Sequence, residues 1–130
     1  MLFRIQGEQS SVPIYEQIVA QVIFGVAAGS IEVGELILSV RDLAERLTVH
    51  PNTVARAYQE LERRGVVIAR RGRGMEVTAE APRICRAARQ DILRGRLRDV
   101  LREAVSSALP LEDIRRLVDE ELAHVNGQLR

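Results

Sequence analysis

The chain has 130 residues and a mass of 14.6 kDa, which allows one domain, or a small domain with an appendage, but excludes two full-sized cores and most large catalytic architectures. Apolar residues make up 46% and charged residues 28%, the balance of a folded protein. The formal net charge of +1 excludes a generally basic surface. Aromatic residues are only 3%, so the core must be aliphatic, which favours helices.

The sequence shows no sign of export or of a membrane span. The best candidate span, residues 12–31, contains Pro13 and Glu16 and falls short of the roughly 20 unbroken apolar residues that a spanning helix needs. The first residues carry no long apolar stretch of the kind that defines a secretion signal. Cys85 is the single cysteine, so it has no partner for an intramolecular disulfide. We therefore expect a cytoplasmic protein that does not contact a membrane.

The first third of the chain predicts a strand and a helix. Apolar residues at positions 2, 3 and 5 predict a short strand. A helix is then predicted from near Pro13 to Gly29, because proline suits a first helical turn and glycine suits the position just past a helix end. Its apolar residues follow helical spacing and would face a core: Ile14, Ile18, Val19, Val22, Ile23 and Val26.

Two shorter helices follow, over residues 39–47 and from Pro51 to Gly65. Ser39 is the predicted N-cap of the first, with Asp42 three residues later in the capping-box position. The second helix should bury one face, made of Val54, Ala57, Tyr58 and Leu61. Its opposite face should then carry polar side chains, namely Asn52, Arg56, Gln59 and Arg63.

A basic hairpin is predicted next. Residues 66–68 and 76–78 have strand character, and glycines at alternate positions between them, Gly72 and Gly74, indicate a tight turn. Its tip is cationic, because five arginines and no acid occur between residues 63 and 74. Residues 79–82 are predicted to be a linker, since Pro82 disfavours helix at the residue before it.

The remaining residues predict two amphipathic helices, over residues 83–108 and from Leu111 to His124 or beyond. Gly95 in the first would mark either a kink or a close backbone contact. Two such helices cannot enclose much core alone and would leave apolar stripes in water, so we expect them to need a partner. The predicted organisation is one domain over residues 1–79 and a helical dimerisation region over residues 83–130.

A short helix, a turn, a second helix with a polar opening and a basic hairpin together form a winged helix-turn-helix. The expected fold is therefore mainly α with a small β-hairpin wing, and the favoured ligand is double-stranded DNA. A helix fits the major groove, where Asn52 would pair with adenine, Arg56 with guanine, and Thr53 with a phosphate or a thymine methyl group. Phosphate contacts are expected from the hairpin arginines Arg70, Arg71 and Arg73.

Four segments carry a family resemblance: residues 13–18 (PIYEQI), 39–44 (SVRDLA), 51–58 (PNTVARAY) and 70–74 (RRGRG). Together they closely resemble the GntR family of bacterial transcription regulators, and its YtrA subfamily in particular, over roughly residues 3–78. The helical tail resembles that subfamily's small C-terminal dimerisation region in length and position.

The resemblance implies roles for individual residues. Arg41 falls at a phosphate or base contact, and Arg71 and Gly72 fall at the wing tip, which enters the minor groove in relatives. His50, Asn52 and Thr53 fall at the turn and the opening of the recognition helix. Two departures stand out. Leu36 and Leu38 replace a basic residue and a proline, which puts one phosphate contact in question. His50 replaces an asparagine, which predicts an altered base preference or a weaker helix cap.

The combined interpretation is a dimeric, sequence-specific transcriptional regulator, a repressor that occupies an inverted repeat with half-sites about 10 base pairs or a multiple apart. The resemblance further implies control of a transporter operon. No cofactor is expected. The tail is too short to enclose a pocket of roughly 300 Å³, so any unknown small-molecule inducer would have to bind at a domain or subunit interface.

Alternatives remain at this stage. The main one is a winged-helix module that binds protein instead of DNA. A fragment of a regulator fused to an aminotransferase is disfavoured, because the chain has no lysine for pyridoxal phosphate. The helix dipole alone would favour Arg63 and Arg64 where they stand, and Arg41 could pair with Glu45.

Catalysis and metal binding are not expected. Cys85, His50 and His124 are too few and too far apart for a metal site. Cys85 would sense oxidants only if neighbouring arginines lowered its pKa, and the alternative is a buried, inert thiol. No nucleophile, base and acid share one predicted surface, so we expect no enzyme.

Overall fold

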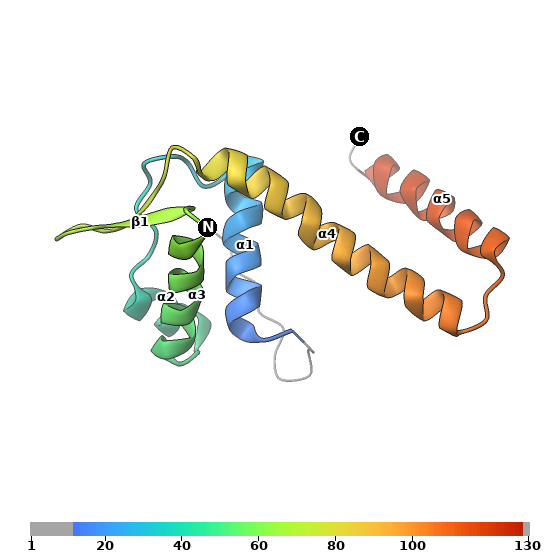
Figure 1. The fold of residues 1–130 in the computed structure, drawn as a ribbon, viewed down its shortest axis with the longest axis horizontal. Helices are drawn as coiled ribbons and strands as arrows, with labels where there is room; N and C mark the ends of the chain where they lie inside the picture. The colour runs from blue at the N-terminus through green and yellow to red at the C-terminus, as the bar shows by residue number, and fades with distance from the viewer. Residues whose placement is uncertain (1–11, 129–130) are drawn as a thin grey trace. The chain divides into compact units, whose positions relative to one another are not determined.

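The computed structural model describes residues 12–128, so the strand predicted at residues 2–5 lies outside the described residues. The described elements are mostly helical, with one hairpin, as the sequence predicts: α1 (Ile14–Ala28), α2 (Val40–Leu47), α3 (Pro51–Arg63), β1 (Val67–Arg70), β2 (Gly74–Val77), α4 (Ala81–Ser106) and α5 (Leu111–Gln128). The chain divides into two compact units, of which unit 1 ends at Ile92 and unit 2 begins at Leu93. Figure 1 shows the course of the chain.

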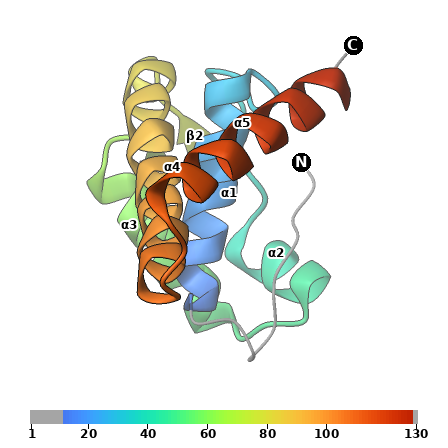
Figure 2. The same cartoon turned by 90° about the vertical axis from the view of Figure 1, so that its right-hand side faces the viewer.

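The first helix, α1, ends where the sequence predicts. Gly29 adopts the left-handed conformation, with a φ of 85°, and caps the helix. Gly25 inside the helix has a packing reason, because a Cβ atom there would lie 2.6 Å from the Cδ1 atom of Ile31. The close approach lets the chain turn back over the end of α1, and the next segment runs from there to α2 (Figure 2).

The helices α2 and α3 form a helix-turn-helix. The predicted cap of α2 is confirmed, since the Ser39 hydroxyl accepts a hydrogen bond of 3.1 Å from the Asp42 amide. The turn contains Thr48 in the left-handed conformation, with a φ of 54°, and the Val49 amide donates to the Ala44 carbonyl at 3.0 Å. Proline then occupies the first position of α3, where its missing amide proton costs nothing.

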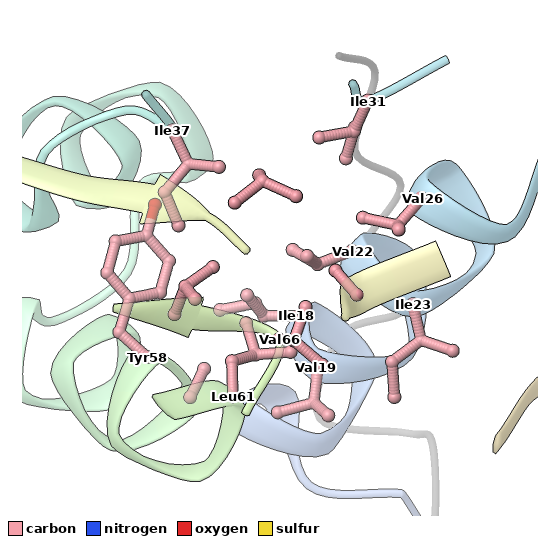
Figure 3. Packing of buried hydrophobic residues seen from close by; sticks show 14 of the residues in the cluster. Ile18, Val19, Val22, Ile23, Val26, Ile31, Ile37, Tyr58, Leu61 and Val66 are labelled. Atoms are coloured by element: carbon pink, nitrogen blue, oxygen red, sulfur yellow. The ribbon is translucent and has the colours of Figure 1, made fainter. Parts of the chain in front are cut away.

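The core of unit 1 is aliphatic, as the composition predicts, and joins α1 to α3. Figure 3 shows Ile18 and Val19 of α1 pointing into the same interior as Leu61 of α3 and Val66 at the start of the hairpin. Tyr58 is the aromatic exception in this core. Its hydroxyl donates a 2.6 Å hydrogen bond to the Leu38 carbonyl and so fastens the segment before α2 to α3. Burial raises the pKa of Tyr58, so this donor stays protonated.

The wing contains longer strands than the sequence predicts, and a further segment of the chain pairs with it. β1 and β2 pair antiparallel, with Val67 opposite Val77 and Arg70 opposite Gly74. The predicted strands at 66–68 and 76–78 are therefore each displaced toward the tip, and the turn is shorter than expected. The segment of residues 34–37 pairs with the other edge of β2, through hydrogen bonds from Gly34 to Val77, from Val77 to Glu35 and from Ile37 to Met75.

The predicted linker at residues 79–82 is wrong in its second half. Ala81 and Pro82 lie in the first turn of α4, a position that tolerates proline because no helical hydrogen bond is lost there. Ala81 and Cys85 are fully buried, and Ile84, Ala88 and Ile92 pack against the same core. The opening turns of α4 therefore belong to unit 1.

Unit 2 comprises the rest of α4 and α5. α4 continues through Gly95, where an added Cβ atom would meet nothing described within 4 Å, so the close contact considered from the sequence is absent from the described residues. Ala108, with a φ of 62°, follows the helix, and α5 begins after Pro110. Across residues 12–128, each helix is too short or too polar to cross a bilayer.

Thr48 gives a testable consequence for stability. A β-branched residue in the left-handed conformation costs roughly 1–2 kcal/mol, whereas glycine adopts it without steric cost. We expect Thr48→Gly to raise the free energy of unfolding by about 0.5–1 kcal/mol, measured by urea denaturation. Thr48→Ala is the control, since it removes the branched side chain but keeps a Cβ atom. A Thr48→Gly protein no more stable than Thr48→Ala would contradict the argument.

Candidate nucleic-acid interface

The outer face of α3 is polar, and its inner face is buried. Asn52, Arg56 and Arg63 are exposed on one side, whereas Val54 and Leu61 are fully buried on the other. Thr53 is half-buried at the start of the helix. The two-faced pattern predicted from the sequence is confirmed, so α3 can offer side chains to a ligand without disturbing the core.

His50 caps α3. Its Nδ1 atom accepts a hydrogen bond of 3.0 Å from the Asn52 amide, so the ring acts as the N-cap that the sequence departure had put in question. A nitrogen that accepts cannot carry a proton, so the other ring nitrogen, Nε2, holds the hydrogen of the neutral ring. The imidazole lies exposed at the opening of the helix, next to Asn52.

Arg56 stacks on an aromatic ring of another helix. Its guanidinium carbon lies 3.9 Å from the centre of the Tyr15 ring, in the first turn of α1. The sequence alone places Arg56 among the exposed residues of α3, but gives no signal for this contact. The arginine is therefore held at one edge of the exposed face of α3, toward α1.

The wing tip exposes Arg71, Gly72 and Arg73. Gly72 has a φ of 76°, a conformation that permits the tight turn, and the Arg73 amide donates to the Arg70 carbonyl at 2.9 Å. Arg70 differs from the other two, because its Nε atom lies 2.9 Å from the Glu76 carboxylate across the hairpin. Residues 63–74 contain no acid, but the fold brings Glu76 of β2 next to Arg70.

Arg63 and Arg64 share a carboxylate. Glu60 accepts hydrogen bonds from both arginines, and these bonds lower its pKa to about 2, so it is ionised at neutral pH. Both arginines lie at the C-terminal end of α3, where the helix dipole favours cations, and the ion pairs with Glu60 are a further structural role that the sequence did not predict. Arg41 is exposed in the first turn of α2, and among the described side chains it forms no ion pair with Glu45.

Beside Arg41, a shallow open hollow of about 240 Å³ is lined by Leu38, Asp42, Glu45 and Arg46. Two acids and one arginine give this lining a formal charge of −1, which does not favour phosphate.

Cys85 is a buried core residue. Burial raises the pKa of its thiol to about 11, so the reactive thiolate is scarce at neutral pH and the inert alternative holds. The described residues contain no group of three His, Cys, Asp or Glu side chains that could hold a metal ion.

A helix-turn-helix followed by a wing with an arginine tip defines a winged helix-turn-helix protein, and the comparisons with known proteins agree. The profile of the bacterial regulatory proteins of the gntR family matches residues 14–77. The HTH-type transcriptional repressor YtrA of Bacillus subtilis is 34% identical over 119 residues, which cover 92% of this chain and 92% of that protein.

Two solved structures are similar to most of this chain. A GntR family transcriptional regulator from Listeria monocytogenes has a TM-score of 0.71 and 34% identity, over 86% of this chain and 97% of that one. YtrA from Sulfolobus acidocaldarius, a GntR-family transcription factor, has a TM-score of 0.56 and 27% identity, over 95% and 99%. The present chain belongs to the gntR family of bacterial regulatory proteins, and it is a DNA-binding transcriptional regulator.

Removing the charge of Arg71 tests the wing. If its guanidinium neutralises one phosphate, Arg71→Ala should weaken binding to all duplexes alike and reduce the slope of log affinity against log salt by about one. Binding can be followed by fluorescence anisotropy across a salt series. Arg83→Ala is a matched control, because Arg83 is an exposed arginine whose charge is already paired with Glu80. An unchanged slope for Arg71→Ala would remove the wing tip from the interface.

Proposed function

We propose that this chain binds an inverted-repeat operator as a homodimer and represses transcription from it. In each protomer α3 occupies the major groove, and the wing lies along the adjacent backbone with its tip in the minor groove. The observation that carries the proposal is that one packed unit presents both surfaces, the polar face of α3 and the arginine tip of the wing. Two copies would then read two half-sites about one helical turn apart.

The opening of α3 provides the base contacts in this proposal. Asn52 is exposed and can donate to and accept from one adenine edge, and Arg56 can donate two parallel hydrogen bonds to guanine. His50 and Thr53 lie within the same turn of chain, where a phosphate or a thymine methyl group is in reach. The positive end of the helix dipole favours the nearby phosphates.

In this proposal, arginines outside the opening of α3 contact the phosphates of the DNA backbone and so position the protein on the duplex. Arg71 and Arg73 flank Gly72 at the exposed tip, and Arg41 is exposed at the start of α2. Arg70 remains a candidate contact, but its pairing with Glu76 reduces the charge that it can offer to a phosphate. The wing therefore contributes mainly through Arg71 and Arg73.

Dimerisation is proposed for unit 2 because its apolar side chains face solvent in the single chain. Leu97, Val100 and Leu122 expose 54%, 63% and 64% of their surface, and Ile114 alone is buried among the large apolar residues of α5. Exposed apolar side chains repeated along two helices are typical of a surface that another chain covers. We take that chain to be a second copy, which also supplies the two-fold symmetry of an inverted repeat.

The wider biological role is proposed from relatives. The similar protein of Bacillus subtilis is named a repressor, and family resemblance implies a transporter operon as the target. We place the protein in the cytoplasm, where bacterial operators lie, and assign it no enzymatic activity. An unidentified inducer would act at the interface between protomers.

Binding to protein instead of DNA is the competing function for the same surfaces. The acidic hollow beside α2 is the observation that favours it, since it does not suit a duplex. The dependence of affinity on salt concentration distinguishes DNA binding from protein binding. Duplex binding through several phosphates weakens steeply as salt rises, whereas a protein interface of mixed charge responds weakly.

Asn52→Ala tests the base contact. The variant should lose about 1–3 kcal/mol of discrimination at one base pair of each half-site, while its affinity for unrelated duplex changes little. Selection of bound fragments from random duplex defines the wild-type consensus, and the variant is then measured on that duplex and its single-base changes. If Asn52→Ala discriminates between the consensus duplex and its single-base changes as the wild type does, the exposed face of α3 is not the surface that reads the bases.

Leu97→Glu tests the dimer. A charge in the exposed apolar stripe of α4 should yield monomers in sedimentation and a large loss of operator affinity, while the core of unit 1 keeps its unfolding temperature. Gln90→Glu adds the same charge at an exposed polar position of α4 and serves as the control. A Leu97→Glu protein that sediments as the wild type does would exclude this stripe from the assembly.

A further inference from the structure

The stack of Arg56 on Tyr15 joins the reading face of α3 to the first turn of α1. The guanidinium carbon lies 3.9 Å from the ring centre, well inside the roughly 6 Å over which a cation is attracted by an aromatic face. Arg56 is exposed, and among residues 12–128 no hydrogen bond or ion pair holds its long side chain. Without the ring, this arginine would sample many rotamers.

Tyr15 is itself held in place. The ring is half-buried and packs against the core of unit 1, and its hydroxyl donates a 3.1 Å hydrogen bond to the Glu16 carboxylate. α1 and α3 share that core, with Ile18 on one helix and Ala57 on the other fully buried. The position of the ring relative to α3 is therefore set by packing that lies outside the proposed interface.

The stack leaves the hydrogen-bonding capacity of Arg56 intact. All five N–H donors of a guanidinium lie in its plane, so an aromatic ring on its face occupies none of them. Arg63, Arg64 and Arg70 are each paired with a carboxylate. Within residues 12–128 no ion pair involves Arg56, and its charge stays available.

We propose that Tyr15 is a positioning residue for DNA recognition, whose ring holds the Arg56 guanidinium ready to donate to paired acceptor atoms of the duplex. The inference rests on the proposed function, because it requires Arg56 to contact DNA. Ordering the side chain before binding lowers the entropy lost on binding. The acceptors are the edge of a guanine or the oxygens of a phosphate, which share the same planar geometry.

The test is a double-mutant cycle in the full-length protein. Wild type, Tyr15→Leu, Arg56→Ala and the double variant are titrated across a salt series with the selected operator duplex, its single-base changes and a scrambled duplex. Tyr15→Leu should weaken operator binding about two- to fivefold, the strength of an exposed cation–π contact. Arg56→Ala should weaken it about 5- to 150-fold. The double variant should bind as Arg56→Ala does.

Tyr15→Phe is the conservative variant, which keeps the ring and loses the hydrogen bond to Glu16. It should restore wild-type operator binding to within about twofold, because the ring alone stacks. A loss in Arg56→Ala at one base pair identifies a guanine contact, and a uniform loss with a lower salt slope identifies a phosphate; either result supports the proposal when Tyr15→Leu shows the same pattern.

The proposal is overturned if Tyr15→Leu weakens binding equally with and without Arg56, since Tyr15 would then act through the fold and not through the arginine. It is also overturned if Tyr15→Leu binds as wild type while Arg56→Ala loses affinity. The proposal is overturned as well if Arg56→Ala binds every duplex unchanged. Failure of the proposed function looks different, because the wild type would then prefer no duplex.

Discussion

Burial of one face of α3 is the constraint on which the rest of the structure depends. The buried face packs against α1 and against the valines of the hairpin nearest to α3, and this packing fixes the rotation of the helix about its axis. The face consists of Val54, Ala57, Tyr58 and Leu61. Rotation would carry these side chains into water, where each large one would lose about 1.5–3 kcal/mol of burial energy. The outward direction of Asn52 and Arg56 is therefore a consequence of packing on the opposite side.

The same packing positions the wing. Val66 and Val67 enter the core directly after α3, and Val77 returns to it from β2. The Thr78 hydroxyl donates a 2.6 Å hydrogen bond to the Gly65 carbonyl, and residues 34–37 pair with the free edge of β2. A two-stranded hairpin alone is marginally stable, so the pairing with residues 34–37 and the buried valines fix the arginine tip relative to α3.

Ion pairs divide the arginines of unit 1 by role. Glu60 neutralises Arg63 and Arg64 at the end of α3, and Glu76 neutralises Arg70 in the wing. The cations that the described structure leaves without such a carboxylate include Arg56 and Arg71, one on each proposed contact surface. A protein with a net charge of only +1 can thus present positive charge locally to a duplex.

Local patterns predicted the helices, the caps at Ser39 and Gly29 and the two faces of α3, because each depends on neighbours within about four residues. Contacts between distant residues could not be predicted in this way. The pairing of residues 34–37 with β2, the Arg70 to Glu76 pair and the stack of Arg56 on Tyr15 each require the tertiary fold. Pro82 misled the prediction, since it suits a helix start as well as a linker.

The roles assigned to His50, Asn52, Thr53 and the arginines are predictions about the complex with DNA. The most direct test is amide hydrogen exchange of the full-length protein with and without its selected operator duplex, resolved along the chain. The account predicts that protection on binding falls on residues 50–56 and on the wing tip at residues 70–74. The account is contradicted if exchange in both segments is the same with and without the duplex, and if the duplex slows exchange only around the acidic hollow of α2.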